Sequence, residues 1–214
     1  LMQPLEAARL FTSALSSQDN LTEAQSRQVK NIDHSLKVAN DLLADLSEIA
    51  RIESGNIKPH VEPVSLRLLF SALEQEFSAQ SSELSCELRV HHNDYWVYSD
   101  RQLLRRMLQN LIGNALRYAS PGKVILGARN KGGFIEIVVL DNGPGIPKDK
   151  QQMVFEQFTQ LESNASTAGQ GLGLGLNIVY NAVVHMMNGS IEAVTEEDGF
   201  VVQIIVPKDV TQSD

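Results

Sequence analysis

Hydrophobic residues follow two different periodicities along this chain, and the change falls near residue 59. Before it, apolar positions recur every three or four residues, which is the spacing of an amphipathic helix. After it, short apolar runs typical of strands are interspersed with longer helical patterns. The pattern therefore predicts an all-helical segment followed by a mixed segment of helices and strands.

The helical segment is expected to form a hairpin. A first helix covers residues 1–18, and polar residues at 16–20 interrupt it. Thr22 and Gln25 have the spacing of a capping box, so a second helix should begin there and end near Gly55. Its apolar positions have heptad spacing and are Ile32, Leu36, Ala39, Leu43, Leu46 and Ala50.

Two helices alone cannot bury a heptad repeat of this kind, so we expect the hairpin to dimerise into a four-helix bundle. On the first helix, either Phe11 or Thr12 joins the apolar side formed by Leu5, Ala8 and Leu15. The alternative is that the hairpin packs onto the second segment of the same chain.

The second segment predicts an α/β sandwich, which gives an α+β chain with a hairpin at residues 1–58 and the sandwich at residues 59–214. The expected strands are residues 61–66, 84–91, 95–98, 123–130, 134–140, 190–195 and 200–206. The expected helices are residues 67–81, a long helix capped by Asp100 and ending near 119, a short helix at 151–161, and a helix that ends near 187.

Composition narrows the possible partners. The chain has 214 residues and a formal net charge of −8, which argues against a nucleic-acid partner and against an anionic membrane surface. Its one cysteine, Cys86, excludes an internal disulfide and is expected to be buried filler. No apolar run approaches the roughly 20 residues of a membrane span. We expect a cytoplasmic location for this segment, whereas the targeting of a longer parent protein cannot be inferred.

Residues 169–176 carry glycine at every second position and run directly into an apolar helical pattern. Glycine lets a ligand approach the backbone closely, and the N-terminus of the following helix suits a phosphate. A glycine run also serves as a flexible loop, so this stretch alone leaves the two interpretations open.

Two further stretches have the chemistry of a nucleotide site. Asn110, Asn114 and Arg117 share one face of the long helix, where they form either a ligand-binding row or an ordinary solvated face. Asp141 follows an apolar strand and precedes Gly143 and Gly145. Its carboxylate can accept the exocyclic N–H of an adenine, although the stretch also fits a simple tight turn.

Together, and in this order, these stretches resemble the core of sensor histidine kinases, whose ATP-binding domain belongs to the superfamily of gyrase B, Hsp90 and MutL. Residues 110–118 resemble the N box, 141–146 the first glycine box, 155–158 the F box and 171–176 the second glycine box. The resemblance covers essentially the whole chain and implies the same fold class, with ATP and Mg²⁺ as ligands.

The resemblance also implies roles for individual residues. Asn114 would ligate Mg²⁺ with support from Asn110, Arg117 would contact phosphate, Tyr118 would line the site, and Asp141 would fix the adenine amino group. The ATP-binding set implied by the resemblance is completed by Gly143, Gly145, Ile146, Phe158, Gln170, Gly171, Leu172, Gly173, Leu174 and Gly175. Residues 148–170 would form a lid.

In the family, the γ-phosphate passes to a histidine of the dimer hairpin and then to an aspartate of a response-regulator receiver domain. Residues 1–5 resemble the end of the segment that carries this histidine, which would lie two positions before Leu1. This chain is therefore expected to bind ATP without phosphorylating itself, and Gln3 occupies the position of a possible phosphatase residue. The alternatives are an ATP-binding dimeric signalling module without kinase activity and another ATPase of the same superfamily.

Overall fold

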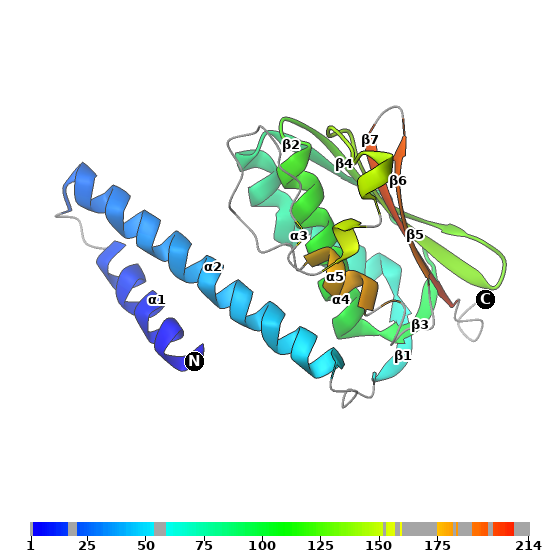
Figure 1. The fold of residues 1–214 in the computed structure, drawn as a ribbon, viewed down its shortest axis with the longest axis horizontal. Coiled ribbons are helices and arrows are strands. Elements are labelled where there is room, and N and C mark those ends of the chain that lie inside the picture. Colours follow the sequence, from blue (N-terminus) through cyan, green and yellow to red (C-terminus); the bar gives the residue numbers. More distant parts are fainter. Residues whose placement is uncertain are drawn as a thin grey trace.

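The computed structural model describes residues 2–16, 21–53, 59–151, 153–156, 159, 175–181, 183, 190–196 and 199–207. It contains a helical hairpin and a mixed domain of helices and strands (Figure 1). The expected α+β organisation is therefore confirmed. None of the described helices is both long and apolar enough to cross a membrane.

The hairpin consists of α1 (Met2–Ser16) and the longer α2 (Glu23–Glu53), which lie side by side (Figure 1). The predicted capping box is present: the Thr22 N–H donates to Gln25 Oε1 at 2.9 Å, and the Gln25 N–H donates to Thr22 Oγ1 at 3.3 Å. Thr12 rather than Phe11 is buried on α1, and its hydroxyl donates to the Ala8 carbonyl. This backbone hydrogen bond allows a polar residue to occupy the inner side of the helix.

The mixed domain is built on a five-stranded sheet with the order β2-β4-β5-β7-β6. Strand β2 runs parallel to β4, and every other neighbouring pair is antiparallel. The strands are β2 (Cys86–Val90), β4 (Gly122–Asn130), β5 (Phe134–Asp141), β6 (Ser190–Glu196) and β7 (Gly199–Pro207). A separate antiparallel pair joins β1 (Val61–Ser65) to β3 (Trp96–Asp100).

Three helices cover one face of the large sheet: α3 (Leu66–Glu83), α4 (Arg101–Tyr118) and α5 (Gly175–Asn181) (Figure 1). The predicted cap of α4 is present, because Asp100 Oδ1 accepts hydrogen bonds from the N–H groups of Gln102 and Leu103. The buried hydrophobic cluster extends from Val64 to Val206, and no described residue of the hairpin belongs to it. The core of the mixed domain thus lies between the helices and the inner face of the sheet.

Several predicted boundaries shift by one or two residues, and two differences have an evident physical reason. The helix expected at residues 151–161 is replaced, where it is described, by the short 3₁₀ turn η2 (Met153–Phe155), which follows another such turn, η1 (Lys148–Lys150). Strand β2 begins at Cys86 instead of residue 84, because Leu84 caps α3 and Ser85 adopts a positive φ of 50°. Cys86 itself is buried, as expected.

Candidate nucleotide-binding site

Helix α4 carries Asn110 and Asn114 along one flank of its buried apolar stripe. Both residues are half-buried, and the Asn110 Nδ2 atom is fully buried with no described residue accepting its hydrogen bonds. A buried amide donor without a partner is costly, by about 1–3 kcal/mol. This atom lacks the partner that water would provide on a solvated face, so the interpretation of this row as a solvated face does not hold for Asn110.

The start of α5 meets this pair of asparagines. A Cβ atom added at Gly175 would lie 3.7 Å from Asn110 Oδ1 and 3.7 Å from Asn114 Nδ2. The structure thus brings the last residue of the glycine run against the helix that carries the two amides. These segments are far apart in sequence, and sequence reasoning placed both of them in one site.

Asp141 ends β5 at the edge of this region and is only 6% exposed. Its Oδ1 atom accepts a hydrogen bond of 2.8 Å from the Gly143 N–H, while no described residue donates to Oδ2. Burial raises the pKa of the Asp141 carboxyl above its ordinary value, and the Gly143 N–H offsets part of that effect. A buried carboxylate with an unused oxygen can accept a hydrogen bond from an amino group of a ligand.

The turn after Asp141 lies directly against the end of α4. A Cβ atom at Gly143 would lie 2.8 Å from Asp141 Oδ1 and 3.0 Å from the Tyr118 carbonyl oxygen, so a side chain would force the turn to move. Gly145 adopts a φ of 68°, which glycine tolerates and other residues rarely do. The two glycines predicted to shape the pocket are therefore required by close contact in one case and by backbone conformation in the other.

The remaining members of the predicted set lie around these groups. Arg117 is half-buried near the end of α4, whereas Tyr118 is half exposed. The carbonyl of Ile146 accepts a hydrogen bond of 3.1 Å from Gln151 Nε2, which ties the turn to η1. Four predicted site residues in the second glycine box, the residue before that box and one residue in the F box lie outside the described residues: Gly171, Leu172, Gly173, Leu174, Gln170 and Phe158. The side chain of Gln3, on α1, is likewise outside the description.

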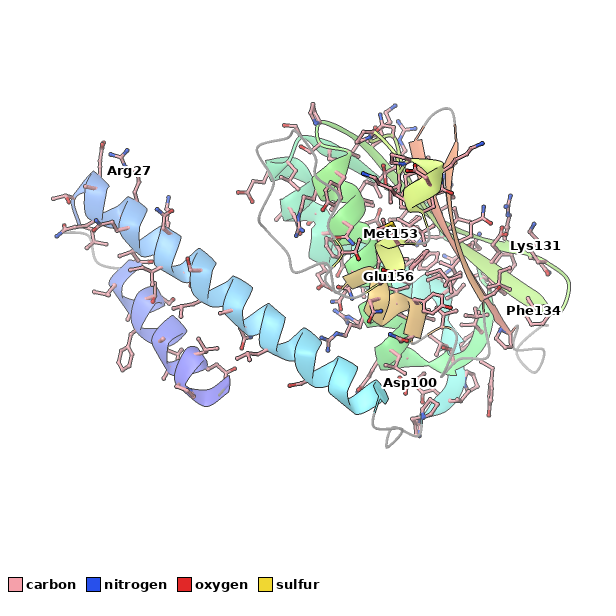
Figure 2. All side chains as sticks on the ribbon, viewed as in Figure 1. Arg27, Asp100, Lys131, Phe134, Met153 and Glu156 are labelled. Carbon is pink, nitrogen blue, oxygen red and sulfur yellow. The ribbon has the colours of Figure 1, made fainter. Side chains whose placement is uncertain are left out.

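A contact that the sequence did not predict joins η2 to α5. The buried Asn177 side chain donates through Nδ2 to the Phe155 carbonyl at 2.8 Å, and Asn181 Nδ2 donates to Asn177 Oδ1 at 3.0 Å. The rings of Phe155 and Tyr180 lie 5.7 Å apart. Figure 2 shows Met153 and Glu156 at the two ends of this turn, beside α5. The only sequence signal was a polar residue, Asn177, within an apolar helical pattern.

The side chains of the candidate site suit a metal ion that binds together with a nucleotide better than a metal ion held by the protein alone. No group of three or more histidine, cysteine, aspartate or glutamate side chains that could hold an ion occurs in the described part of the chain. Mg²⁺ commonly takes one or two protein oxygen ligands together with substrate phosphates and water. The amide oxygens of Asn110 and Asn114 suit that kind of site.

Comparison with known proteins identifies the family. The sequence profile of the family described as Histidine kinase-, DNA gyrase B-, and HSP90-like ATPase matches residues 99–210, which is more than half of the chain. The chain belongs to this family. The match includes α4, Asp141 and the whole glycine run, which contribute the groups of the candidate site.

Among proteins of similar sequence, the sensor protein kinase PmrB of Pseudomonas aeruginosa is 31% identical over 99% of this chain and 44% of its own length. The sensor-like histidine kinase SenX3 of Mycolicibacterium smegmatis is 32% identical over 89% of this chain and 50% of its own length. The chain therefore spans about half the length of these relatives.

Among solved structures, full-length ShkA in complex with AMPPNP superimposes with a TM-score of 0.77 and 26% identity, over 97% of this chain and 43% of that one. The histidine kinase AdeS of Acinetobacter baumannii, at 20% identity, shares the fold with a TM-score of 0.70 over 97% of this chain and 95% of that one. The resemblance to the sensor histidine kinase core, and the fold that it implied, are confirmed.

Proposed function

We propose that this chain is the dimerisation and ATP-binding core of a protein-histidine kinase in a two-component system. The observation that carries the proposal is the convergence of Gly175 on Asn110 and Asn114, together with the buried Asp141, whose turn lies against the C-terminal end of the same helix. Membership in an ATPase family, and similarity to full-length ShkA in complex with AMPPNP, support ATP as the ligand.

In this proposal Asp141 recognises the adenine base of ATP. The ionised carboxylate accepts a hydrogen bond from the adenine amino group through Oδ2, while Oδ1 remains bound to the Gly143 N–H. The absence of a side chain at Gly143 and the positive φ of Gly145 let the turn follow the edge of the base. Ile146 and Tyr118 complete the wall of the pocket, and Phe158 is assigned to it by resemblance.

The triphosphate is assigned to the space between α4 and the glycine run, on the side of the site opposite the adenine pocket. Asn110 Nδ2 donates to a phosphate oxygen, which provides the acceptor that this buried amide needs. Asn114 provides an oxygen for Mg²⁺, which neutralises phosphate charge, and Arg117 contacts phosphate. By resemblance, residues 170–175 are assigned to the phosphates and residues 148–170 to a lid. Such a site contributes mainly by positioning and by charge neutralisation.

The hairpin provides the dimer and the phosphate acceptor. Exposed apolar side chains on α1 and α2 support a four-helix bundle between two copies, with residues 1–58 as one domain and residues 59–214 as the other. The acceptor is a histidine two positions upstream of Leu1, from which the phosphoryl group passes to an aspartate of a receiver domain. The contact between α2 and α5 supports an arrangement with the hairpin beside the nucleotide domain. Gln3, one turn beyond the proposed histidine, would position water for dephosphorylation of the receiver domain.

The test is phosphorylation of a chain extended upstream of Leu1. The extended protein is incubated with radiolabelled Mg-ATP, and we expect label that is labile in acid and stable in base, as for phosphohistidine. The unextended chain should bind ATP and stay unlabelled. Nucleotide binding without label in the extended chain would favour a signalling module without kinase activity, and multiple turnover without phosphoprotein would favour an ATPase.

A further inference from the structure

The turn that follows β5 is tied to the start of β4 by the side chain of Asn142. Its Oδ1 atom lies 2.6 Å from the Lys123 backbone nitrogen, and its own N–H donates to the Lys123 carbonyl at 3.2 Å. Because a backbone N–H can only donate, the atom that faces it is the amide oxygen. Asn142 thus adds a pair of hydrogen bonds beyond the last strand pair, Val124 with Asp141.

The space occupied by this amide is kept open by Gly122. A Cβ atom there would lie 2.3 Å from Asn142 Oδ1 and 2.2 Å from the Ala119 carbonyl oxygen. Ala119 caps the C-terminus of α4. The amide oxygen of Asn142 therefore lies against the connection that leads from α4 into β4. Gly143, the next residue along the turn, contacts the Tyr118 carbonyl of the same helix end.

From these contacts we infer that Asn142 is a positioning residue for the base-binding carboxylate: its amide oxygen fixes the turn so that Asp141 and Gly143 hold their orientation before nucleotide arrives. This inference rests on the proposed function, because it concerns the same adenine pocket. Asn142 itself is exposed, and its oxygen is engaged by Lys123, so its effect on the base is exerted through its two neighbours.

The physical basis is preorganisation. The Gly143 N–H keeps one oxygen of Asp141 in place, and that bond persists only while the turn is held. Without the Asn142 amide, the turn must be ordered at the moment of binding, and the cost is subtracted from the affinity. Since adenine is common to ATP and ADP, both nucleotides should lose affinity by the same factor.

The experiment measures binding of Mg-ATP and Mg-ADP by calorimetry at pH 8. Asn142→Ala should weaken both by about fivefold, as expected for one lost hydrogen bond. Asn142→Asp keeps an acceptor for the Lys123 N–H and should restore most of the affinity. Asn130→Ala, at the exposed far end of β4, is the matched control and should bind like the wild type.

A second measurement works without nucleotide: hydrogen exchange of the Gly143 amide, followed by NMR, should accelerate in Asn142→Ala and not in Asn130→Ala. Unchanged exchange, unchanged affinity, loss of ATP affinity alone, or failure of Asn142→Asp to rescue would each overturn the inference. If the wild type binds no ATP while exchange of the Gly143 amide accelerates in Asn142→Ala, the proposed function fails and the positioning of the turn stands.

Discussion

Helix α4 of the mixed domain buries a complete apolar stripe, whereas the hairpin leaves large apolar side chains in solvent. On α4, Leu104 and Ile112 are fully buried. On α1 and α2, Leu10 is 71% exposed, Phe11 72% and Ile32 52%. Both regions show a regular apolar periodicity in the sequence. The periodicity alone therefore does not tell which of them buries its apolar side chains within one chain.

The difference shows what each region requires. The mixed domain has a sheet whose inner face covers its helices, so its core closes within the chain. The hairpin has only two helices, which bury little more than Val29 and Thr12 among their described side chains. Burying a Phe or Leu side chain is worth about 1.5–3 kcal/mol, and a second copy of the hairpin would supply this contribution. Two consequences of this comparison can be measured.

The largest expected effect is on the stability of the mixed domain. Leu104→Ala should lower the free energy of unfolding by about 2–5 kcal/mol, because it leaves a cavity in a closed core. Leu10→Ala should change the same quantity by less than about 0.5 kcal/mol. The single tryptophan, Trp96, lies on β3, so its fluorescence during urea unfolding reports on the mixed domain. Equal effects of the two substitutions would contradict the separation at residue 58.

The second effect concerns association. Phe11→Glu should weaken dimerisation at least about tenfold, because it removes an apolar contact and places a charge in the interface. Sedimentation velocity over a concentration series measures the shift toward monomer. Ala79→Glu introduces the same charge at an exposed position of α3 and should leave the dimer intact. If Phe11→Glu has no effect on association, the chain does not dimerise through this part of the hairpin.

Elements governed by local chemistry were predictable from the sequence. The Thr22–Gln25 capping box and the Asp100 cap need only residues three or fewer positions apart, and both are present. The Asn142–Lys123 and Asn177–Phe155 contacts join residues 19 and 22 positions apart, and they depend on strand register and helix packing. The 3₁₀ turn η2 was mistaken for a helix because the Asn177 contact with its carbonyl is tertiary.

The site could be predicted to the extent that its motifs follow one another along the sequence in a recognisable order. The association of Asn110, Asn114 and Gly175 followed from that order, and the structure brings these three residues together. The buried, unpaired state of Asn110 Nδ2 could not be foreseen, because helical periodicity assigns a residue to a face without telling how deeply that face is covered. The boundary at residue 58 and the dimer stay predictions.

The central claim is that Asp141 reads adenine in this chain, and calorimetry of Mg-ATP with Asp141→Asn tests it most directly. The amide cannot provide the ionised acceptor, so affinity should fall about 100-fold or more, while Glu83→Gln, on the exposed end of α3, should bind normally. Because burial raises the pKa of Asp141, the charged carboxylate lowers the stability of the folded state above that pKa. The neutral Asp141→Asn variant should therefore be at least as stable as the wild type at pH 8. Wild-type affinity should fall as the pH is lowered through this raised pKa. Undiminished binding by a folded Asp141→Asn protein would contradict the account.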